Sequence, residues 1–346
     1  MSERPPPQQK KPGPAPLPAI EDVFDFINRD IPEPPQLIKG VLHKGCKMAL
    51  GGGSKAYKSW MFIDLAVSVA YGLPWIGFET TQAKVCYLNF ELPAFGFQQR
   101  VLRVMGAKDA SKMNQPGPGW FQVWNLRGHS AGHKIIVPRL RDHLLSSGCG
   151  LIVLDPIYKL YGGADENSAG DISELQNSLE ALSNETGAAI ISASHFSKGN
   201  QANKKSIDRI SGSGVFARDP DAIVTFTDLK ADEDEDSFDK ESFACEATLR
   251  NFPPVKPFAV TWEFPLMGRN DSLDPTKLEG QSGRPKTHTA GVILSLLPAD
   301  GFTSTEWQKM ALSEKEISRA TFYRLRDELD KQGRVAKSKD DKWRPV

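Results

Sequence analysis

The sequence predicts an α/β protein with a mainly parallel sheet, followed by a small domain of helices and a hairpin. Short apolar runs alternate with segments of helical periodicity; the runs are 85–88, 151–154, 189–192 and 223–226. Continuous apolar runs of this kind are typical of strands that helices bury on both faces. The helix before the third run is the clearest, because Ile172, Leu175 and Leu179 share one stripe and Gly187 follows.

Composition divides the chain into four zones. Residues 1–19 are rich in Pro, Gln and Lys and are expected to form a disordered tail. Residues 20–267 are expected to form the α/β domain and residues 268–288 a Gly, Pro and Ser linker. Residues 289–346 are expected to form the final domain.

The loop after the short apolar run 47–50 carries the most informative motif. The phosphate-binding pattern G-x-x-x-x-G-K-[ST] fits residues 52–59 with one departure, since Tyr57 stands where the second glycine belongs. In such a loop the lysine, here Lys58, reaches the β and γ phosphates of ATP, and the hydroxyl of Ser59 ligates Mg2+. We expect nucleotide contacts along the whole loop, from Gly52, Gly53, Ser54, Lys55, Ala56, Tyr57, Lys58, Ser59 and Trp60.

An ordinary glycine-rich turn is the alternative for this loop. Tyr57 favours that alternative, because a side chain strains a backbone position that glycine accepts freely, at a cost of roughly 1 kcal/mol. The strand before the loop and the helix expected from Trp60 to Tyr71 favour a P-loop, which connects a strand to a helix.

Polar side chains follow three of the predicted strands. Ligands of open α/β sheets gather at the carboxyl ends of strands, where we expect Asp155, Glu91 and His195. Asp155 is a candidate for holding Mg2+ through its water shell, Glu91 for the general base and His195 for a γ-phosphate sensor. The alternatives are an apolar run that merely ends in Asp, a Glu that caps the next helix and a hydrogen-bonded structural His.

Two basic features are candidates for further contacts. The polar segment from Phe196 to Gly214 suits a DNA backbone, or else is a solvated surface loop; its basic residues are Lys198, Lys204, Lys205 and Arg209. Arg250 closes a later strand and is a candidate arginine finger for a neighbouring subunit, or else a structural arginine at a hairpin end. The acidic run 232–236 is expected to be a solvated hairpin tip.

In order along the chain, these motifs resemble those of RecA-like hexameric ATPases, and most closely the RepA-type replicative helicases of plasmids and prophages. The resemblance runs from Pro35 to about Leu266 and rests on the loop 52–59, 87–91, 154–156, 194–198, 212–214 and 250–251. It implies the roles given above for Lys58, Ser59, Glu91, Asp155 and His195, and a finger in trans at Arg250, with Arg209 and Arg218 as rivals. Tyr57 departs from the family pattern, as does Thr248 or Leu249 where the family often has lysine.

The final domain resembles a winged helix. Helices are expected over residues 290–297, 304–312 and 318–332, and a two-stranded wing over 333–339 and 342–344. Basic side chains at Arg319, Arg324 and Lys337 suit contact with duplex DNA, although winged helices also bind proteins.

Overall composition restricts the location and the partners. Lys and Arg total 43 and Asp and Glu total 43, so a nucleic-acid surface must be local. The four cysteines lack metal-ligand spacing, and no long apolar span or signal peptide is present. We therefore expect a cytoplasmic protein that contacts no membrane.

These expectations combine into one main function and two alternatives. The main expectation is a ring-forming ATPase, hexameric and dependent on ATP and Mg2+, that acts as a helicase on single-stranded DNA in the replication of a mobile element or phage. The first alternative is a nucleotide-gated DNA-binding regulator or recombination mediator with slow turnover. The second is a transcription factor whose winged helix binds duplex DNA.

Overall fold

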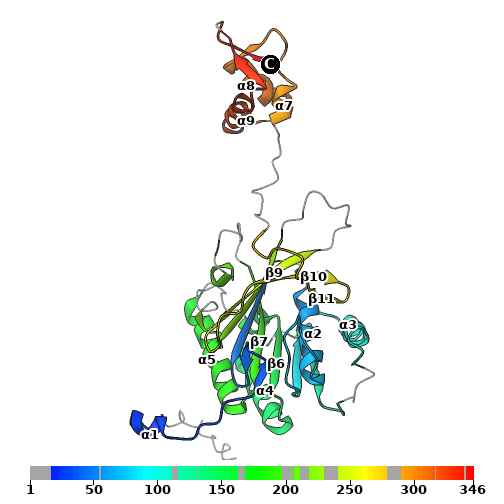
Figure 1. The fold of residues 1–346 in the computed structure, drawn as a ribbon, viewed down its shortest axis with the longest axis vertical. Helices are drawn as coiled ribbons and strands as arrows, with labels where there is room; N and C mark the ends of the chain where they lie inside the picture. The colour runs from blue at the N-terminus through cyan, green and yellow to red at the C-terminus, as the bar shows by residue number, and fades with distance from the viewer. Residues whose placement is uncertain are drawn as a thin grey trace, which may run out of the picture.

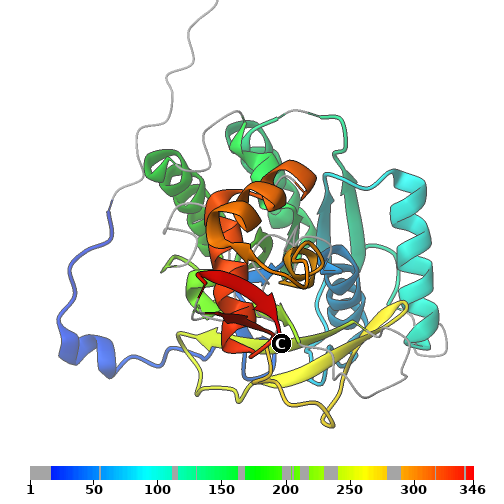
Figure 2. The same cartoon turned by 90° about the horizontal axis from the view of Figure 1, so that it is seen from above.

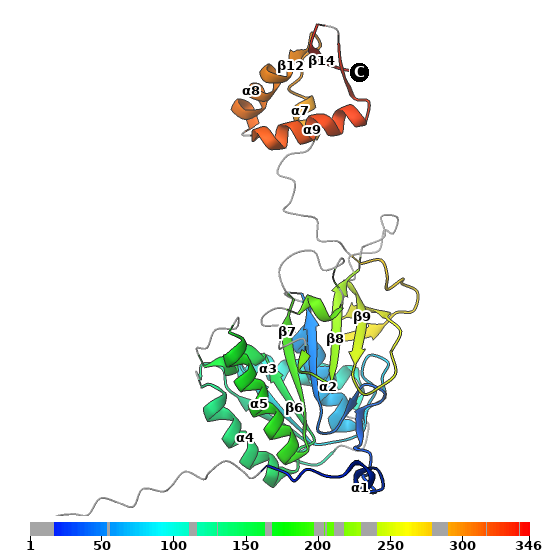
Figure 3. The same cartoon turned by 90° about the vertical axis from the view of Figure 1, so that its left-hand side faces the viewer.

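The computed structural model describes most of the chain, and its arrangement is drawn in Figures 1, 2 and 3. The described residues are 17–53, 56–110, 116–129, 131–162, 168–196, 204, 206–210, 218–229, 241–278, 290–315, 317–338 and 340–346. The predicted tail therefore lies outside the described residues up to residue 16, as does the acidic run 232–236.

A nine-stranded sheet forms the centre of the fold, in the order β11-β10-β9-β8-β3-β7-β6-β4-β5 (Figure 1). The parallel strands are β3 (Lys47–Gly52), β4 (Val85–Asn89), β5 (Phe121–Asn125), β6 (Leu151–Asp155), β7 (Ala189–His195) and β8 (Ala222–Asp228). The antiparallel strands are β9 (Ser242–Leu249), β10 (Phe258–Glu263) and β11 (Leu266–Arg269). The prediction of a mainly parallel sheet is confirmed.

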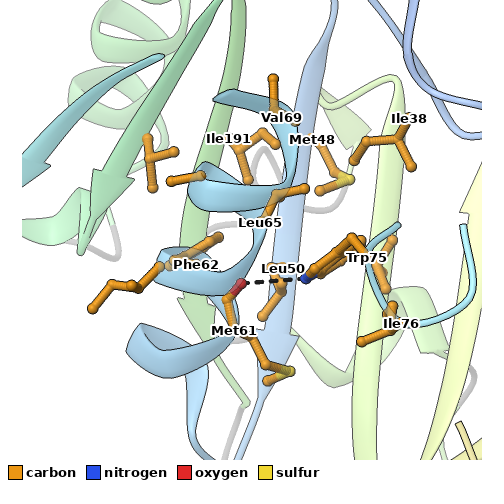
Figure 4. Packing of buried hydrophobic residues seen from close by; sticks show 14 of the residues in the cluster. Ile38, Met48, Leu50, Met61, Phe62, Leu65, Val69, Trp75, Ile76 and Ile191 are labelled. Carbon is orange, nitrogen blue, oxygen red and sulfur yellow. Dashed lines mark hydrogen bonds between the residues drawn. The ribbon is translucent and has the colours of Figure 1, made fainter. Parts of the chain in front are cut away.

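Helices cover both faces of this sheet, which explains its uniformly apolar strands. One hydrophobic cluster joins α2 (Lys58–Tyr71) and α3 (Ala94–Ala107) to one face, and a second joins α4 (His133–Ser147) and α5 (Ala169–Thr186) to the other (Figure 3). In the first cluster the indole of Trp75 donates a hydrogen bond to the carbonyl of Met61, 3.3 Å away (Figure 4). The helix predicted before Gly187 is α5, and Gly187 ends it with φ 66°.

Smaller elements complete this part of the chain. They are α1 (Val23–Ile27), β1 (Gln36–Ile38), β2 (Leu42–His43), η2 (Ile157–Tyr161) and η3 (Ser206–Arg209). The short helix α1 projects away from the sheet in Figures 1 and 2, and none of its residues is buried. No helix in the described ranges is long and apolar enough to cross a membrane.

The C-terminal elements have a hydrophobic cluster of their own, which includes Trp307, Phe322, Leu325 and Leu329. The helices are α7 (Ala290–Leu294), α8 (Ser304–Lys315) and α9 (Arg319–Lys331), and the strands are β12 (Phe302–Thr303), β13 (Val335–Lys337) and β14 (Lys342–Pro345). Ser318 caps α9, because its hydroxyl oxygen accepts from the N–H of Thr321. The expected hairpin is present as the antiparallel pair β13 and β14, and β12 adds a third strand by pairing with β14 on the side opposite β13.

Candidate nucleotide-binding site

The predicted phosphate loop follows β3, the central strand of the nine-stranded sheet. Gly52 at the end of β3 pairs in register with His195 of β7 and with Phe226 of β8. A side-chain carbon on Gly51 would lie 3.1 Å from the ring of Phe196, closer than most real contacts. The glycine run is therefore needed for close packing at this edge of the sheet as well as for the turn that follows.

Tyr57 adopts the backbone conformation that a glycine would adopt freely. Its φ and ψ angles are 53° and 19°, in the left-handed region, and it is the residue directly before the first turn of α2. For a residue with a side chain this conformation costs about 1–2 kcal/mol. The predicted strain at this position is therefore present in the structure.

Lys58 is the first residue of α2 and is buried, with 8% of its surface exposed. Its ammonium donates hydrogen bonds to the carbonyl oxygens of Gly52 and Gly53, at 3.1 and 2.5 Å. Burial lowers the pKa of Lys58 to about 8, and the nearby Asp155 carboxylate opposes that shift. A buried cation held by neutral carbonyls is well suited to an anionic ligand such as a phosphate.

Asp155 ends β6 and is buried beside the start of α2. The hydroxyl of Tyr87 donates to the Asp155 carboxylate at 2.6 Å, and Ser59 donates to it as well. Burial raises the pKa of Asp155, and the two hydrogen bonds oppose the rise. Adjacent hydroxyl and carboxylate oxygens are the donors that Mg2+ prefers, so these residues fit the predicted cation.

Glu91 lies two residues beyond β4, at the same edge of the sheet. The amide of Asn89 fixes the turn, because its oxygen accepts from the Leu92 N–H at 2.9 Å and its nitrogen donates to the Leu92 carbonyl at 2.8 Å. The hydroxyl of Tyr158, on η2, donates to the exposed Glu91 carboxylate. Burial and this hydrogen bond raise the pKa of Tyr158 to about 12, so Tyr158 stays a donor that orients Glu91.

Two further side chains lie at this edge of the sheet. His195 ends β7 with its side chain exposed, and the N–H of the next residue, Phe196, donates to the Gly52 carbonyl at 3.2 Å. Asp228 ends β8, and its carboxylate oxygen would lie 3.7 Å from a side-chain carbon on Gly53. Burial raises the pKa of Asp228. Sequence reasoning missed Asp228, although the criterion of a polar side chain after a buried strand would have found it.

An aromatic cluster flanks the loop on the side of the antiparallel strands. The ring of Tyr57 stacks on Trp262 of β10, with centroids 4.1 Å apart and planes inclined by 14°. Trp60 lies 5.9 Å from Trp262 and 5.3 Å from Phe264, and the Arg100 guanidinium lies 4.7 Å from the Trp60 ring. Trp60 therefore belongs to this cluster. Of the predicted nucleotide contacts, Ser54 and Lys55 lie outside the described residues.

Arg250 lies at the opposite edge of the sheet from the phosphate loop. Its guanidinium donates to the Arg218 carbonyl at 2.7 Å and to the Asp221 carboxylate at 3.4 Å, beside the first residues of β8. Because β3 and β8 are parallel, this is the amino end of both strands. Arg250 therefore contributes nothing to the loop of its own chain, and a role as a finger requires a second subunit.

The predicted DNA contacts are divided by the structure. Arg209 is only 3% exposed, and its guanidinium donates to Thr227 at 2.9 Å and pairs with Glu246. This burial contradicts the expectation that Arg209 contacts a DNA backbone, because its guanidinium is buried and bonded to Thr227 and Glu246 inside the protein. Lys204 is described and half-buried, whereas Lys198 and Lys205 lie outside the described residues.

The predicted basic residues of the C-terminal elements lie on α9 and β13. Arg324 forms an ion pair with Glu328 at 3.8 Å, and Lys337 forms one with Asp341 at 2.5 Å. The guanidinium of Arg319 lies 5.8 Å from the ring of Tyr323. These side chains are far along the chain from the phosphate loop, on elements that have a hydrophobic cluster of their own.

Comparison with known proteins gives a family for the chain. The model of the AAA domain family matches residues 13–201, more than half of the chain. One solved structure that the comparison matches is a KaiC-like protein of the hyperthermophilic archaeon Pyrococcus horikoshii, with a TM-score of 0.45 and 11% identity over 68% of this chain and 93% of that one. No curated protein matches the sequence. The chain belongs to the AAA domain family, and its large, mostly parallel sheet fits the core of a RecA-like P-loop ATPase.

Proposed function

We propose that the chain is an ATP-dependent motor that assembles into a hexameric ring and acts as a helicase on single-stranded DNA, in the replication of a mobile element or phage. The observation that carries this proposal is the set of side chains at the carboxyl ends of four neighbouring strands. Lys58, Ser59, Asp155, Glu91 and His195 meet there, although they are spread over more than a hundred residues of sequence.

The arrangement suits hydrolysis of the γ phosphate of ATP. Lys58 holds the phosphates, while Ser59 and Asp155 would hold Mg2+, which neutralises charge that develops on the phosphate oxygens. Water forms the new bond to phosphorus as the bond to the ADP oxygen breaks, and the Glu91 carboxylate accepts the proton that the water loses. Tyr158 keeps the Glu91 carboxylate oriented by its hydrogen bond. His195, at the end of β7, would contact the terminal phosphate.

Self-assembly is supported by an apolar segment that the fold leaves uncovered. The segment 17–31 exposes seven large apolar side chains: Leu17, Ile20, Val23, Phe24, Phe26, Ile27 and Ile31, each at least 48% exposed. Such a concentration of apolar surface is typical of a contact with another protein. A second subunit would also supply Arg250, whose side chain is 54% exposed at the far edge of the sheet.

Contact with single-stranded DNA is supported by the position at which the polar loop leaves the sheet. The loop starts directly after His195, and its described ends are joined because Phe196 and Ile210 form a β-bridge. Both residues lie within 3.4 Å of where a side chain on Gly51 would begin. The base of the loop thus packs on β3, the strand that precedes the phosphate loop. A conformational change at the phosphate site could therefore be transmitted to the loop that we propose contacts DNA.

Contact with duplex DNA is proposed for the C-terminal elements, which we interpret as a winged helix forming a domain from residue 289 onward. Ser304 to Lys315 and Arg319 to Lys331 are consecutive helices, and β13 and β14 follow as an antiparallel pair. Arg319 and Arg324 on the second of these helices would make the phosphate or base contacts.

The test is ATP turnover with Mg2+, in the presence and absence of single-stranded DNA, together with the native mass of the complex. We expect turnover that rises with DNA, a mass of several subunits and DNA binding that weakens steeply with salt. Absence of DNA stimulation, with Lys58→Ala turning over ATP like the wild type, would remove the motor function.

A nucleotide-gated DNA-binding regulator or recombination mediator is the second candidate, and the left-handed backbone of Tyr57 favours it. A strained loop is compatible with slow turnover, in which case ATP serves as an assembly signal. Unwinding of a forked duplex separates the two candidates, since only the helicase separates the strands.

A further inference from the structure

We propose that Trp262 is a positioning residue for the nucleotide site: by stacking on Tyr57, it holds the phosphate loop in the left-handed conformation that glycine normally provides. The inference rests on the proposed nucleotide site and adds a residue from β10, a strand that carries no predicted site residue. It also explains how the loop tolerates the departure at Tyr57.

The conformation of Tyr57 needs support from elsewhere in the molecule. A tyrosine with φ 53° is strained, and such residues persist only where the surroundings over-determine them. The backbone carbonyl of Tyr57 accepts from the N–H of Met61 at 3.0 Å, which starts the hydrogen bonding of α2. A rotation at Tyr57 would therefore displace Lys58 and Ser59, the next two residues.

The support comes from three contacts that reach the same ring. Trp262 stacks on it at 4.1 Å, Phe243 meets it edge-on at 6.4 Å, and the Glu241 side chain is hydrogen-bonded to its hydroxyl. Burial and the Glu241 hydrogen bond raise the pKa of Tyr57, so the hydroxyl stays protonated and remains a donor. Each contact acts on the side chain of Tyr57 and, through it, holds the backbone conformation. A glycine at this position would adopt the same conformation without such contacts.

Trp262 is itself held on a rigid element. It lies within β10, opposite Met267 of β11, and its backbone N–H donates to the Glu241 carbonyl at 2.8 Å. Glu241 therefore contacts both partners of the stack, one through its backbone and the other through its side chain. The antiparallel strands and the phosphate loop are joined at this point.

A double-mutant cycle tests the inference, with Trp262→Ala made in the wild type and in Tyr57→Gly. The full-length protein is titrated with Mg2+ and the fluorescent nucleotide MANT-ADP, and thermal unfolding is recorded without nucleotide. In the wild-type background we expect Trp262→Ala to weaken binding about tenfold, because the strained tyrosine is released. In the Tyr57→Gly background we expect the same change to alter binding less than twofold, because glycine adopts the conformation unaided.

A matched control is Phe264→Leu, two residues further along the chain. Phe264 contacts Trp262 and Trp60 and is exposed, and no contact joins it to Tyr57 among the described residues. We expect it to leave MANT-ADP binding within twofold in both backgrounds. Trp262→Phe should restore most of the affinity, since a phenyl ring can still stack.

The outcomes distinguish this inference from the proposed function. An equal loss of affinity after Trp262→Ala in both backgrounds would overturn the positioning role, because a purely structural tryptophan would act whether or not Tyr57 is present. Loss of all binding in Tyr57→Gly would overturn it as well. If the wild type binds no nucleotide, the proposed function fails, and the cycle in thermal unfolding still decides whether the two rings are coupled.

Discussion

A buried lysine lies near each end of β3, and the two lysines differ in the groups that bind them. Lys47 at the start of the strand forms ion pairs with Glu180 at 2.5 Å and Asp219 at 2.7 Å. Lys58, just beyond the end of the strand, donates to two backbone carbonyls and forms no ion pair within the described part of the chain. Lys47, whose charge is balanced by two carboxylates, is structural. Lys58, which is held by neutral carbonyls, is suited to binding an anion.

The same contrast extends to the neighbouring side chains. At the amino end of the sheet, Arg250 is bonded to Asp221 and to the Arg218 carbonyl, which leaves the charges matched. At the carboxyl end, Asp155, Glu91 and Asp228 lie near one ammonium group, and burial lowers its pKa to about 8. The charges at the amino end of the sheet balance one another, whereas those at the carboxyl end do not. Unbalanced charge at the carboxyl end is what a binding site in an open α/β sheet requires.

The largest expected effect comes from removing the unmatched lysine. We expect Lys58→Ala to lower ATP turnover by at least about a hundredfold, because the phosphates lose the ammonium of Lys58. Unfolding in urea should be unchanged or should require more denaturant, since the variant removes a buried charge that forms no ion pair within the described residues. Turnover close to that of the wild type would break the comparison.

The next effect tests the carboxylate that orients water. We expect Glu91→Gln to lower kcat by about a hundredfold while nucleotide affinity stays within threefold, because the amide cannot accept the proton of the attacking water. Steady-state kinetics and MANT-ADP titration measure the two quantities separately. An equal loss in affinity and in kcat would instead assign Glu91 to nucleotide binding.

Stability should respond at the other end of the strand. We expect Lys47→Met to destabilise the fold by about 1–3 kcal/mol, because two carboxylates lose their partner and both remain partly exposed to water. The free energy of unfolding in urea gives this value, and MANT-ADP affinity should not change. A loss of nucleotide binding without a loss of stability would contradict the structural role.

The smallest expected effect concerns the orientation of Glu91. We expect Tyr158→Phe to lower kcat about threefold to tenfold with KM unchanged, since the ring stays in place and only the hydrogen bond to Glu91 is lost. In the Glu91→Gln background the same substitution should have almost no effect on kcat. A full additional effect there would show that Tyr158 acts independently of Glu91.

Much of the fold followed from local patterns. The apolar runs ending at Asp155 and His195 are strands β6 and β7, because a buried parallel strand needs nothing beyond its own composition and flanking turns. The edge where Lys58, Glu91 and Asp155 meet was also predictable, since the carboxyl ends of parallel strands share one edge.

Other features depend on contacts between distant segments and left no local signal. The burial of Arg209 follows from Glu246 on β9, and the support of Tyr57 follows from Trp262 on β10. The position of Arg250 follows from the antiparallel register of β8 and β9, which places Leu249 opposite Ala222. Tyr158 could have been suspected, because it comes three residues after Asp155 at the same edge.

The most direct measurement of the contrast between the two lysines is calorimetric binding of Mg-ADP to three proteins: the wild type, Lys58→Ala and Lys47→Met. We predict that Lys47→Met binds with the affinity of the wild type and that Lys58→Ala shows no measurable binding. Wild-type affinity in Lys58→Ala would contradict the assignment of the nucleotide site to the carboxyl end of β3.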